Sequence, residues 1–367
     1  MPYPKKHKKL GESTSSGDGA GQAGVAETAV GGKGEGSGGK GKGGGRGGGK
    51  GVGGFGKGDG RGGGGGKGRG GRGGHGKGGH GKGGGGPPGV DLGQCRTPNE
   101  VTRALEGHAL TAQQASHAVF LLTKLHGGVD YGGGGWAHLA AQLVCGAPEL
   151  RARQLSTTMY ALGKLGSPVG EALGEALGAR LAACAVELDT IGVSNTLWSC
   201  AKAGWTPRPA CVSALCARLS HLLPELNGQD LANTCVGLGG LHSGGAAPPE
   251  ATLAGLHRAL SAKAAELRPQ EICSVLAALA HLPAAPPSTL SALLGAASLM
   301  AHRLTPRDVA TICHALGRAV CQENAASLDA AALEFLRTAV GAAANRFNAQ
   351  DVSSALVGLS ALVRRDL

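Results

Sequence analysis

Aromatic side chains are scarce in this chain, which has four Phe, three Tyr and three Trp among 367 residues. Modules that recognise nucleic acids by stacking bases on an aromatic sheet are therefore disfavoured. Apolar runs are short, and none reaches the roughly 18–20 residues of a membrane span or has the form of a secretory signal. We therefore expect no association with a membrane.

Motifs of catalysis and metal binding are also lacking. The sequence has no Walker loop, no nucleophile–base set, no paired carboxylates, and no Cys-X-X-Cys pair among its ten cysteines. Most of the cysteines fall in apolar helical stretches, where reduced thiols act as small apolar side chains. The sequence thus predicts a protein that is not an enzyme and that uses no metal, no cofactor and no small-molecule substrate.

Charge and glycine are distributed unevenly along the chain. Residues 1–86 contain 42 of the 70 Gly and 16 of the 36 Lys and Arg, but only five Asp and Glu, so they carry the whole net charge of +11. This segment has too few large apolar side chains to offset its backbone entropy. It has little Pro and no strict three-residue period, so it is not collagen-like. We expect residues 1–89 to form a disordered, Gly-rich basic tail.

Single cations interrupt the glycines of this tail at short intervals. Spaced cations on a flexible chain can neutralise the phosphates of a single strand with little sequence preference. A solubilising linker has a similar composition, so both interpretations stay open. The candidate phosphate contacts each begin an Arg-Gly-Gly triplet, and they are Arg46, Arg61, Arg69 and Arg72.

The remainder of the chain carries no net charge, and a block of sixteen residues recurs in it seven times. Each block begins with an apolar residue and continues with residues that favour a helix start. Apolar residues then follow at positions 6, 9 or 10, 13 and 16, which is the period of a helix. The blocks predict seven helices, here called A helices, near 110–125, 150–165, 188–203, 226–241, 267–282, 304–319 and 347–362.

A second periodic segment, often opened by Pro, separates consecutive blocks and predicts a B helix, as in 248–267 and 286–304. Small residues at positions 12 and 14 permit close approach of the A helices. Because one helical pair buries too little apolar surface alone, consecutive pairs must stack. We expect an all-α fold over 90–367, a right-handed α-solenoid of about seven hairpins of roughly 38 residues. The first unit has the Gly-rich connection 126–136, which predicts a short B helix.

Three stretches of these blocks resemble the octotricopeptide repeat, a helical-pair unit of about 38 residues described in algal organelle proteins. They are Asn-Thr-Leu-Trp-Ser-Cys-Ala-Lys-Ala-Gly at 195–204, Gln-Asp-Leu-Ala-Asn-Thr at 229–234 and Tyr-Ala-Leu-Gly-Lys-Leu-Gly at 160–166. The repeat is similar to helical regions of FAST-kinase-like mitochondrial proteins and of trypanosomatid RNA-editing substrate-binding subunits. Many relatives end in a RAP domain, a small nuclease-like module. None is present up to Leu367, so either the protein is short or the sequence is truncated.

The resemblance covers most of 110–362 and implies sequence-selective binding of single-stranded organellar RNA. The implied effects are on transcript stability, processing, splicing or translation, in a chloroplast or mitochondrion and together with other RNA-processing proteins. The basic start Met1–Lys9 is followed by acidic residues, so no clear transit peptide is recognisable.

If positions 6, 10 and 13 are buried, positions 4, 8, 11 and 15 form one neighbouring stripe along the A helix. Position 8 is always polar and can read a base edge, position 11 is sometimes large enough to stack on a base, and position 15 is often cationic. The base-reading candidates are His117, Thr157, Asn195, Asn233, Ser274, Thr311 and Ser354 at position 8, with Tyr160, Trp198 and His314 at position 11. The phosphate-binding candidates at position 15 are Lys124, Lys164, Lys202, His281 and Arg318.

Each of these positions also has a purely structural interpretation. Position 8 can cap or bridge helices, Tyr160 and Trp198 can pack in the ordinary way, and a cation at position 15 can complement the helix C-terminus. The neutral charge of the repeat region is unusual for an RNA-binding surface. A protein–protein interaction scaffold without RNA contact is therefore the second hypothesis.

Overall fold

The computed structural model describes residues 90–321 and 328–366. Within these residues it has fourteen α-helices, seven short 3₁₀ helices and no strand, which confirms the all-α fold. The predicted tail, including Arg46, Arg61, Arg69 and Arg72, lies outside the described residues.

One A helix begins in each sixteen-residue block. The A helices are α2 (Ala112–Leu122), α4 (Ala152–Leu165), α6 (Thr190–Lys202), α8 (Gly228–Ser243), α10 (Pro269–Leu279), α12 (Pro306–Val320) and α14 (Ala349–Asp366). The B helices are α3 (Gly134–Gly146), α5 (Glu171–Cys184), α7 (Pro209–Leu222), α9 (Glu250–Lys263), α11 (Pro287–Leu299) and α13 (Ala330–Ala343). The 3₁₀ turn η1 (Leu92–Gln94) and the helix α1 (Pro98–Leu105) precede them.

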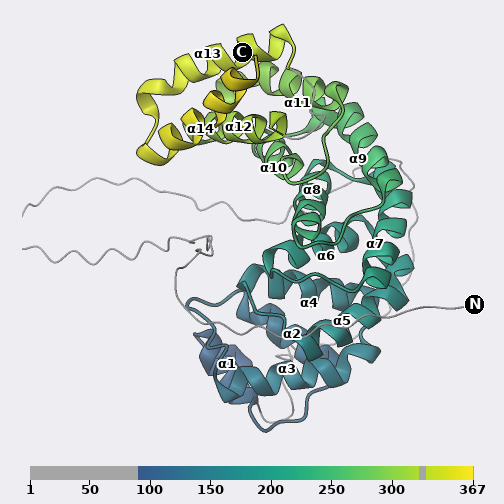
Figure 1. The fold of residues 1–367 in the computed structure, drawn as a ribbon. Coiled ribbons are helices and arrows are strands. Elements are labelled where there is room, and N and C mark those ends of the chain that lie inside the picture. Colours follow the sequence, from purple (N-terminus) through teal and green to yellow (C-terminus); the bar gives the residue numbers. More distant parts are fainter. Residues whose placement is uncertain (1–89, 322–327, 367) are drawn as a thin grey trace, which may run out of the picture. The chain divides into compact units, whose positions relative to one another are not determined.

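Consecutive A helices pack side by side, and so do consecutive B helices (Figure 1). Helix α6, for example, packs between α4 and α8, while its partner α7 packs between α5 and α9. Helix α1 packs against both α2 and α3. Neighbouring hairpins are thus joined through both of their helices, and this arrangement repeats along the described chain.

A 3₁₀ turn follows each B helix and leads to position 1 of the next block. These turns are η2 (Ala147–Glu149), η3 (Ala185–Glu187), η4 (Leu223–Glu225), η5 (Ala264–Glu266), η6 (Ala301–Arg303) and η7 (Ala344–Arg346). The position-1 residues Leu150 and Leu188 are buried, and their carbonyl oxygens accept hydrogen bonds of 2.7 Å from Arg180 Nε and Arg218 Nε. In these two units the following B helix therefore holds the residue that precedes the A helix.

The side chain at position 5 of the block stabilises the helix start by a hydrogen bond, and not only by its charge. In α10 the position-5 carboxylate of Glu271 accepts the backbone N–H of Arg268 at 2.8 Å, and in α12 Asp308 accepts that of Thr305 at 2.9 Å. A side chain at this position thereby binds an N–H that the helix cannot pair itself. The position-5 residues with such a bond are Gln114, Gln154, Glu271, Asp308 and Asp351.

Glycine sets the separation of the A helices. A Cβ added to Gly163 in α4 would lie 2.8 Å from Ser199 Cα in α6, and one added to Gly237 in α8 would lie 2.7 Å from the Leu197 carbonyl oxygen. Both separations are shorter than real Cβ atoms allow, so the backbones touch directly. These glycines occupy the small positions 12 and 14 of the block.

The prediction of a short B helix in the first unit is wrong. Helix α3 has 13 residues, as many as α11, because two glycines of the Gly-rich connection form its first turn. A Cβ at Gly135 would lie 2.8 Å from the Thr102 carbonyl oxygen of α1. Glycine at this point allows α3 to pack closely on α1. The local sequence alone indicates a connecting loop, because it does not show this contact.

The ten cysteines all lie in the described residues and are free thiols, and seven of them are buried. Burial raises the pKa of both Cys211 and Cys235 to about 12, so these thiols stay protonated and unreactive. Among the described residues no group of three or more His, Cys, Asp or Glu could hold a metal ion. In the same part of the chain, no helix has the length and apolarity needed to span a membrane.

A pair of Gly→Ala substitutions tests the close approach. We expect Gly237→Ala to lower the free energy of unfolding by about 1–3 kcal/mol, because the new methyl group overlaps the α6 backbone. Gly295 in α11 is exposed and would meet no atom within 4 Å, so Gly295→Ala should leave stability unchanged or raise it by up to about 1 kcal/mol. Urea unfolding of the full-length variants, followed by circular dichroism, measures both changes. Equal stability of the two variants would show that Gly237 does not limit the helix separation.

Candidate nucleic-acid interface

Positions 4, 8, 11 and 15 of the seven A helices form one solvent-accessible surface, which we call the A-face. Position 4 is exposed in every A helix, and the cationic side chains at position 15 are all exposed. Positions 8 and 11 are half-buried apart from His117 and Val357, which are exposed. The neighbouring positions 6 and 10 are buried in the first six A helices. The sequence-predicted stripe is therefore accessible to a ligand along its whole length.

The A-face differs sharply in charge from the rest of the repeat region. Residues 87–367 as a whole contain equal numbers of acidic and basic residues, 20 of each. The A-face has no Asp or Glu at any of its four positions. Its cationic residues are Lys124, Arg153, Lys164, Lys202, Arg307 and Arg318, and it also holds His117, His281 and His314.

Sequence reasoning overlooked two of these cations, Arg153 and Arg307, which occupy position 4 of α4 and α12. Both are exposed. An alignment of the blocks column by column would have found them, since position 4 varies between Gln, Arg and Ile but is never acidic. The net charge conceals the pattern, because acidic residues elsewhere in the repeat region cancel the A-face charge.

Aromatic side chains of adjacent repeats meet on the A-face. The rings of Tyr160 in α4 and Trp198 in α6 stack with centroids 5.8 Å apart and an interplanar angle of 29°. Lys202 Nζ lies 6.0 Å from the Trp198 ring centroid, and Lys124 Nζ lies 4.9 Å from that of Phe120. Cations and rings of positions 11 and 15 thus share one surface, where a cation over a ring is stabilised.

Two of the position-8 amides are joined across neighbouring repeats. Asn233 Nδ2 donates to Asn195 Oδ1 at 3.2 Å, and Asn233 Oδ1 accepts from Gln229 Nε2 at 3.0 Å. This chain of amides links α8 to α6. The structure therefore gives Asn195 and Asn233 a bridging contact, which was one of the structural interpretations of position 8.

Three position-8 hydroxyls donate back into their own helices. Thr157, Ser274 and Thr311 each donate to the carbonyl oxygen four residues earlier, at 2.8 Å. The donation occupies the hydroxyl proton and leaves lone pairs on the oxygen. At these positions the side chain is suited to accept a hydrogen bond from a ligand N–H group. The remaining two position-8 residues are the exposed His117 and the half-buried Ser354.

His281 lies within electrostatic reach of the next repeat. Partial burial, together with the charges of Arg318 and His314, lowers the pKa of His281 below its ordinary value of 6.5. Its imidazole is therefore neutral at pH 7 and becomes cationic on acidification. Positions 15 and 11 of adjacent repeats are thus electrostatically coupled at this end of the A-face.

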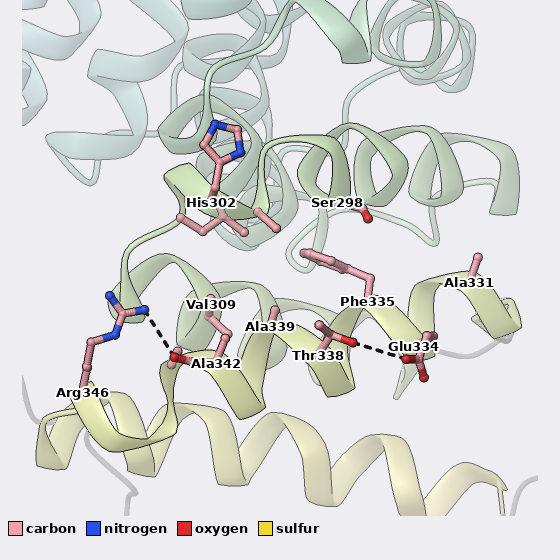
Figure 2. Close-up of a pocket in the computed structure, with 13 residues that line it drawn as sticks. Ser298, His302, Val309, Ala331, Glu334, Phe335, Thr338, Ala339, Ala342 and Arg346 are labelled. Atoms are coloured by element: carbon pink, nitrogen blue, oxygen red, sulfur yellow. Dashed lines mark hydrogen bonds between the residues drawn. The ribbon is translucent and has the colours of Figure 1, made fainter.

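A groove of about 620 Å³ lies off the A-face, between α13 and the helix α11 with the 3₁₀ turn η6 that follows it. Figure 2 shows Phe335, Thr338 and Ala339 of α13 opposite Ser298 and His302. Its lining residues include many alanines, and its Glu334 carboxylate accepts hydrogen bonds from Arg337 Nε at 2.8 Å and Nη2 at 2.6 Å. The groove is walled largely by small apolar side chains, and its one carboxylate, that of Glu334, is paired with Arg337.

Comparison with protein-family models and with curated proteins finds no match to this chain. The chain is therefore assigned to no family, and the A-face carries the evidence on function.

Proposed function

We propose that this protein is a non-enzymatic helical-repeat protein that binds single-stranded RNA along the A-face. Its role is post-transcriptional: the stability, processing, splicing or translation of transcripts in a chloroplast or mitochondrion. The observation that carries the proposal is the charge of the A-face, which has cations and no acidic residue within a neutral repeat region. The octotricopeptide-like blocks supply the organellar part of the proposal.

A surface of this kind favours a long, flexible polyanion. Exposed cations lie on α4, α6 and α12, so the phosphates of one strand that lie opposite these helices can each find a positive charge. Phosphate contacts supply affinity and position the strand without reading its sequence. The tail residues Arg46, Arg61, Arg69 and Arg72 add a further non-specific attraction in this scheme.

Sequence preference would come from position 8. In an unpaired strand the base edges are free, and helical-repeat proteins read one base per repeat with two or three side chains, of which position 8 supplies the hydrogen-bonding one. The hydroxyl oxygens at Thr157, Ser274 and Thr311 accept a hydrogen bond from a base N–H group, because each hydroxyl proton is donated within its own helix. Asn195 and Asn233 form a bonded pair, so reading a base there requires the ligand to share or replace that bond. Tyr160 and Trp198 offer a paired-ring platform on which a base stacks.

The arrangement in this proposal is a right-handed α-solenoid, with octotricopeptide-like hairpins as its unit. Contacts between consecutive A helices and between consecutive B helices support it. In such an array every hairpin presents the same positions at a regular interval, which suits a ligand with a repeating backbone.

A protein–protein scaffold is the second candidate. Helix α14 favours it, because this helix exposes large apolar side chains that a partner protein could cover: Leu356 is 60% and Val363 is 59% exposed. Leu356 occupies position 10, which is buried in the first six A helices. Purification of the full-length protein with and without ribonuclease separates the two candidates. Complexes that survive ribonuclease and contain no RNA would favour the scaffold.

Charge-matched triple variants test the A-face. We expect Lys164→Ala, Lys202→Ala and Arg318→Ala together to weaken binding of single-stranded RNA by at least about tenfold at low salt. The slope of log affinity against log salt should also fall by about 2, since three phosphate contacts are lost. The control variant combines Arg103→Ala, Arg258→Ala and Arg303→Ala, which remove the same charge at exposed sites off the A-face. Fluorescence anisotropy measures both. Equal losses in the two triple variants would rule out the A-face as the binding surface.

The lowered pKa of His281 predicts that the affinity for RNA depends on pH. A phosphate nearby favours the imidazolium form, so RNA binding should take up a proton and raise this pKa. Because the pKa in the free protein lies below 6.5, RNA affinity should rise as the pH falls from about 7.5 to about 5.5. His281→Ala should remove part of this rise, and His302→Ala, an exposed histidine of η6, should retain it. An unchanged pH profile in His281→Ala would exclude His281 from the interface.

A further inference from the structure

A hollow of about 420 Å³ opens on the A-face between α12 and α14. Helix α12 lines it with His314, Gly317 and Arg318, and helix α14 with Ala361 and Arg364 among others. The volume is within the range of small-ligand sites. The hollow is distinct from the groove between α11 and α13.

Small residues at positions 11 and 15 of α14 leave the hollow open, in contrast to the aromatic pair of α4 and α6. Position 11 holds Tyr160 and Trp198 in α4 and α6, whose rings fill the corresponding surface. Position 11 is Val357 in α14, and position 15 there is Ala361. The floor is backbone: a Cβ at Gly317 would lie 2.9 Å from the Gly358 carbonyl carbon.

The charge of the hollow is concentrated and positive. Arg318 and Arg364 are exposed, His314 is half-buried, and no Asp or Glu lines the hollow. Arg364 is oriented by its own helix, since its Nε donates to the Ser360 carbonyl oxygen at 3.1 Å and its Nη2 to Ser360 Oγ at 3.3 Å. A guanidinium has five N–H donors, so several are left for a ligand. Two guanidinium groups therefore serve one hollow, whereas α4 and α6 each place one Lys at position 15.

We propose that this hollow binds the terminal phosphomonoester of an RNA strand together with its nucleotide. A phosphomonoester carries between one and a half and two charges at neutral pH, about twice the charge of an internal phosphodiester. Two arginines match this charge and can each form paired hydrogen bonds with phosphate oxygens. The glycine and alanine floor leaves room for the ribose and base, on which His314 can stack. The proposal rests on the proposed RNA-binding function and assigns this part of the A-face to strand ends.

The chemistry is shared by a 5′-phosphate and a 3′-phosphate, and the experiment distinguishes them. Three RNAs of one sequence, roughly 12 nucleotides long, carry a 5′-phosphate, a 3′-phosphate or hydroxyls at both ends. Fluorescence anisotropy with the full-length protein gives the affinity for each. We expect one phosphorylated form to bind about tenfold more tightly than the hydroxyl form, as expected for one further charge-assisted contact.

Variants locate the source of this difference. Arg364→Ala should abolish the preference while binding of the hydroxyl RNA stays within about twofold of the wild type. Ala361→Leu, which fills the hollow without changing charge, should also abolish the preference. Lys202→Ala, on α6, should weaken binding of all three RNAs and keep their ratio.

The outcomes separate this inference from the proposed function. Binding of all three RNAs with equal affinity would overturn the inference and leave RNA binding intact. A preference that persists in both Arg364→Ala and Ala361→Leu would also overturn it, because another site would then read the end. Failure of the full-length protein to bind any of the RNAs would overturn the proposed function itself.

Discussion

Neighbouring A helices approach one another so closely that only glycine and other small residues fit between parts of them. At Gly163 and Gly237 the backbone of the adjacent helix occupies the space that a side chain would need. Such a contact has little freedom to slide, because both surfaces are rigid backbone. The relative position of consecutive repeats is therefore fixed, and with it the alignment of the surface residues.

That fixed alignment brings equivalent positions of neighbouring repeats together. Position 8 meets position 8 where Asn233 bonds to Asn195, and position 11 meets position 11 where Tyr160 stacks on Trp198. The surface is consequently organised in columns that cross the helices. A surface that holds cations and no acidic residues can then attract a chain of phosphates, even though the repeat region as a whole is neutral.

Periodicity along one helix was predictable from the sequence, whereas contacts between repeats were not. The 3.6-residue period and the Pro and Gly punctuation predicted the all-α fold and the separation of exposed from buried positions. The bond from Asn233 to Asn195 depends on the distance between α6 and α8, which no pattern within one block contains. The role of the glycines that begin α3 was not predictable, because it depends on the Thr102 backbone of α1.

The same distinction applies to the candidate site. The block alignment placed Lys164, Lys202 and Arg318 on an exposed stripe, and they are exposed. The hollow beside Arg318 was not predictable, because it results from the backbone contact of Gly317 with Gly358 and from a small residue at Ala361. The hollow forms between α12 and α14, which belong to consecutive repeats about forty residues apart in the sequence.

Photo-crosslinking of the full-length protein to a 4-thiouridine-containing single strand, with mass spectrometry of the crosslinked peptides, tests the central claim most directly. The A-face account predicts crosslinks at Phe120, Tyr160 and Trp198, which lie on successive A helices. Trp205 is an internal control, since it packs against α5 and lies off the A-face. Crosslinks confined to residues 1–89 or to Trp205 would contradict the account.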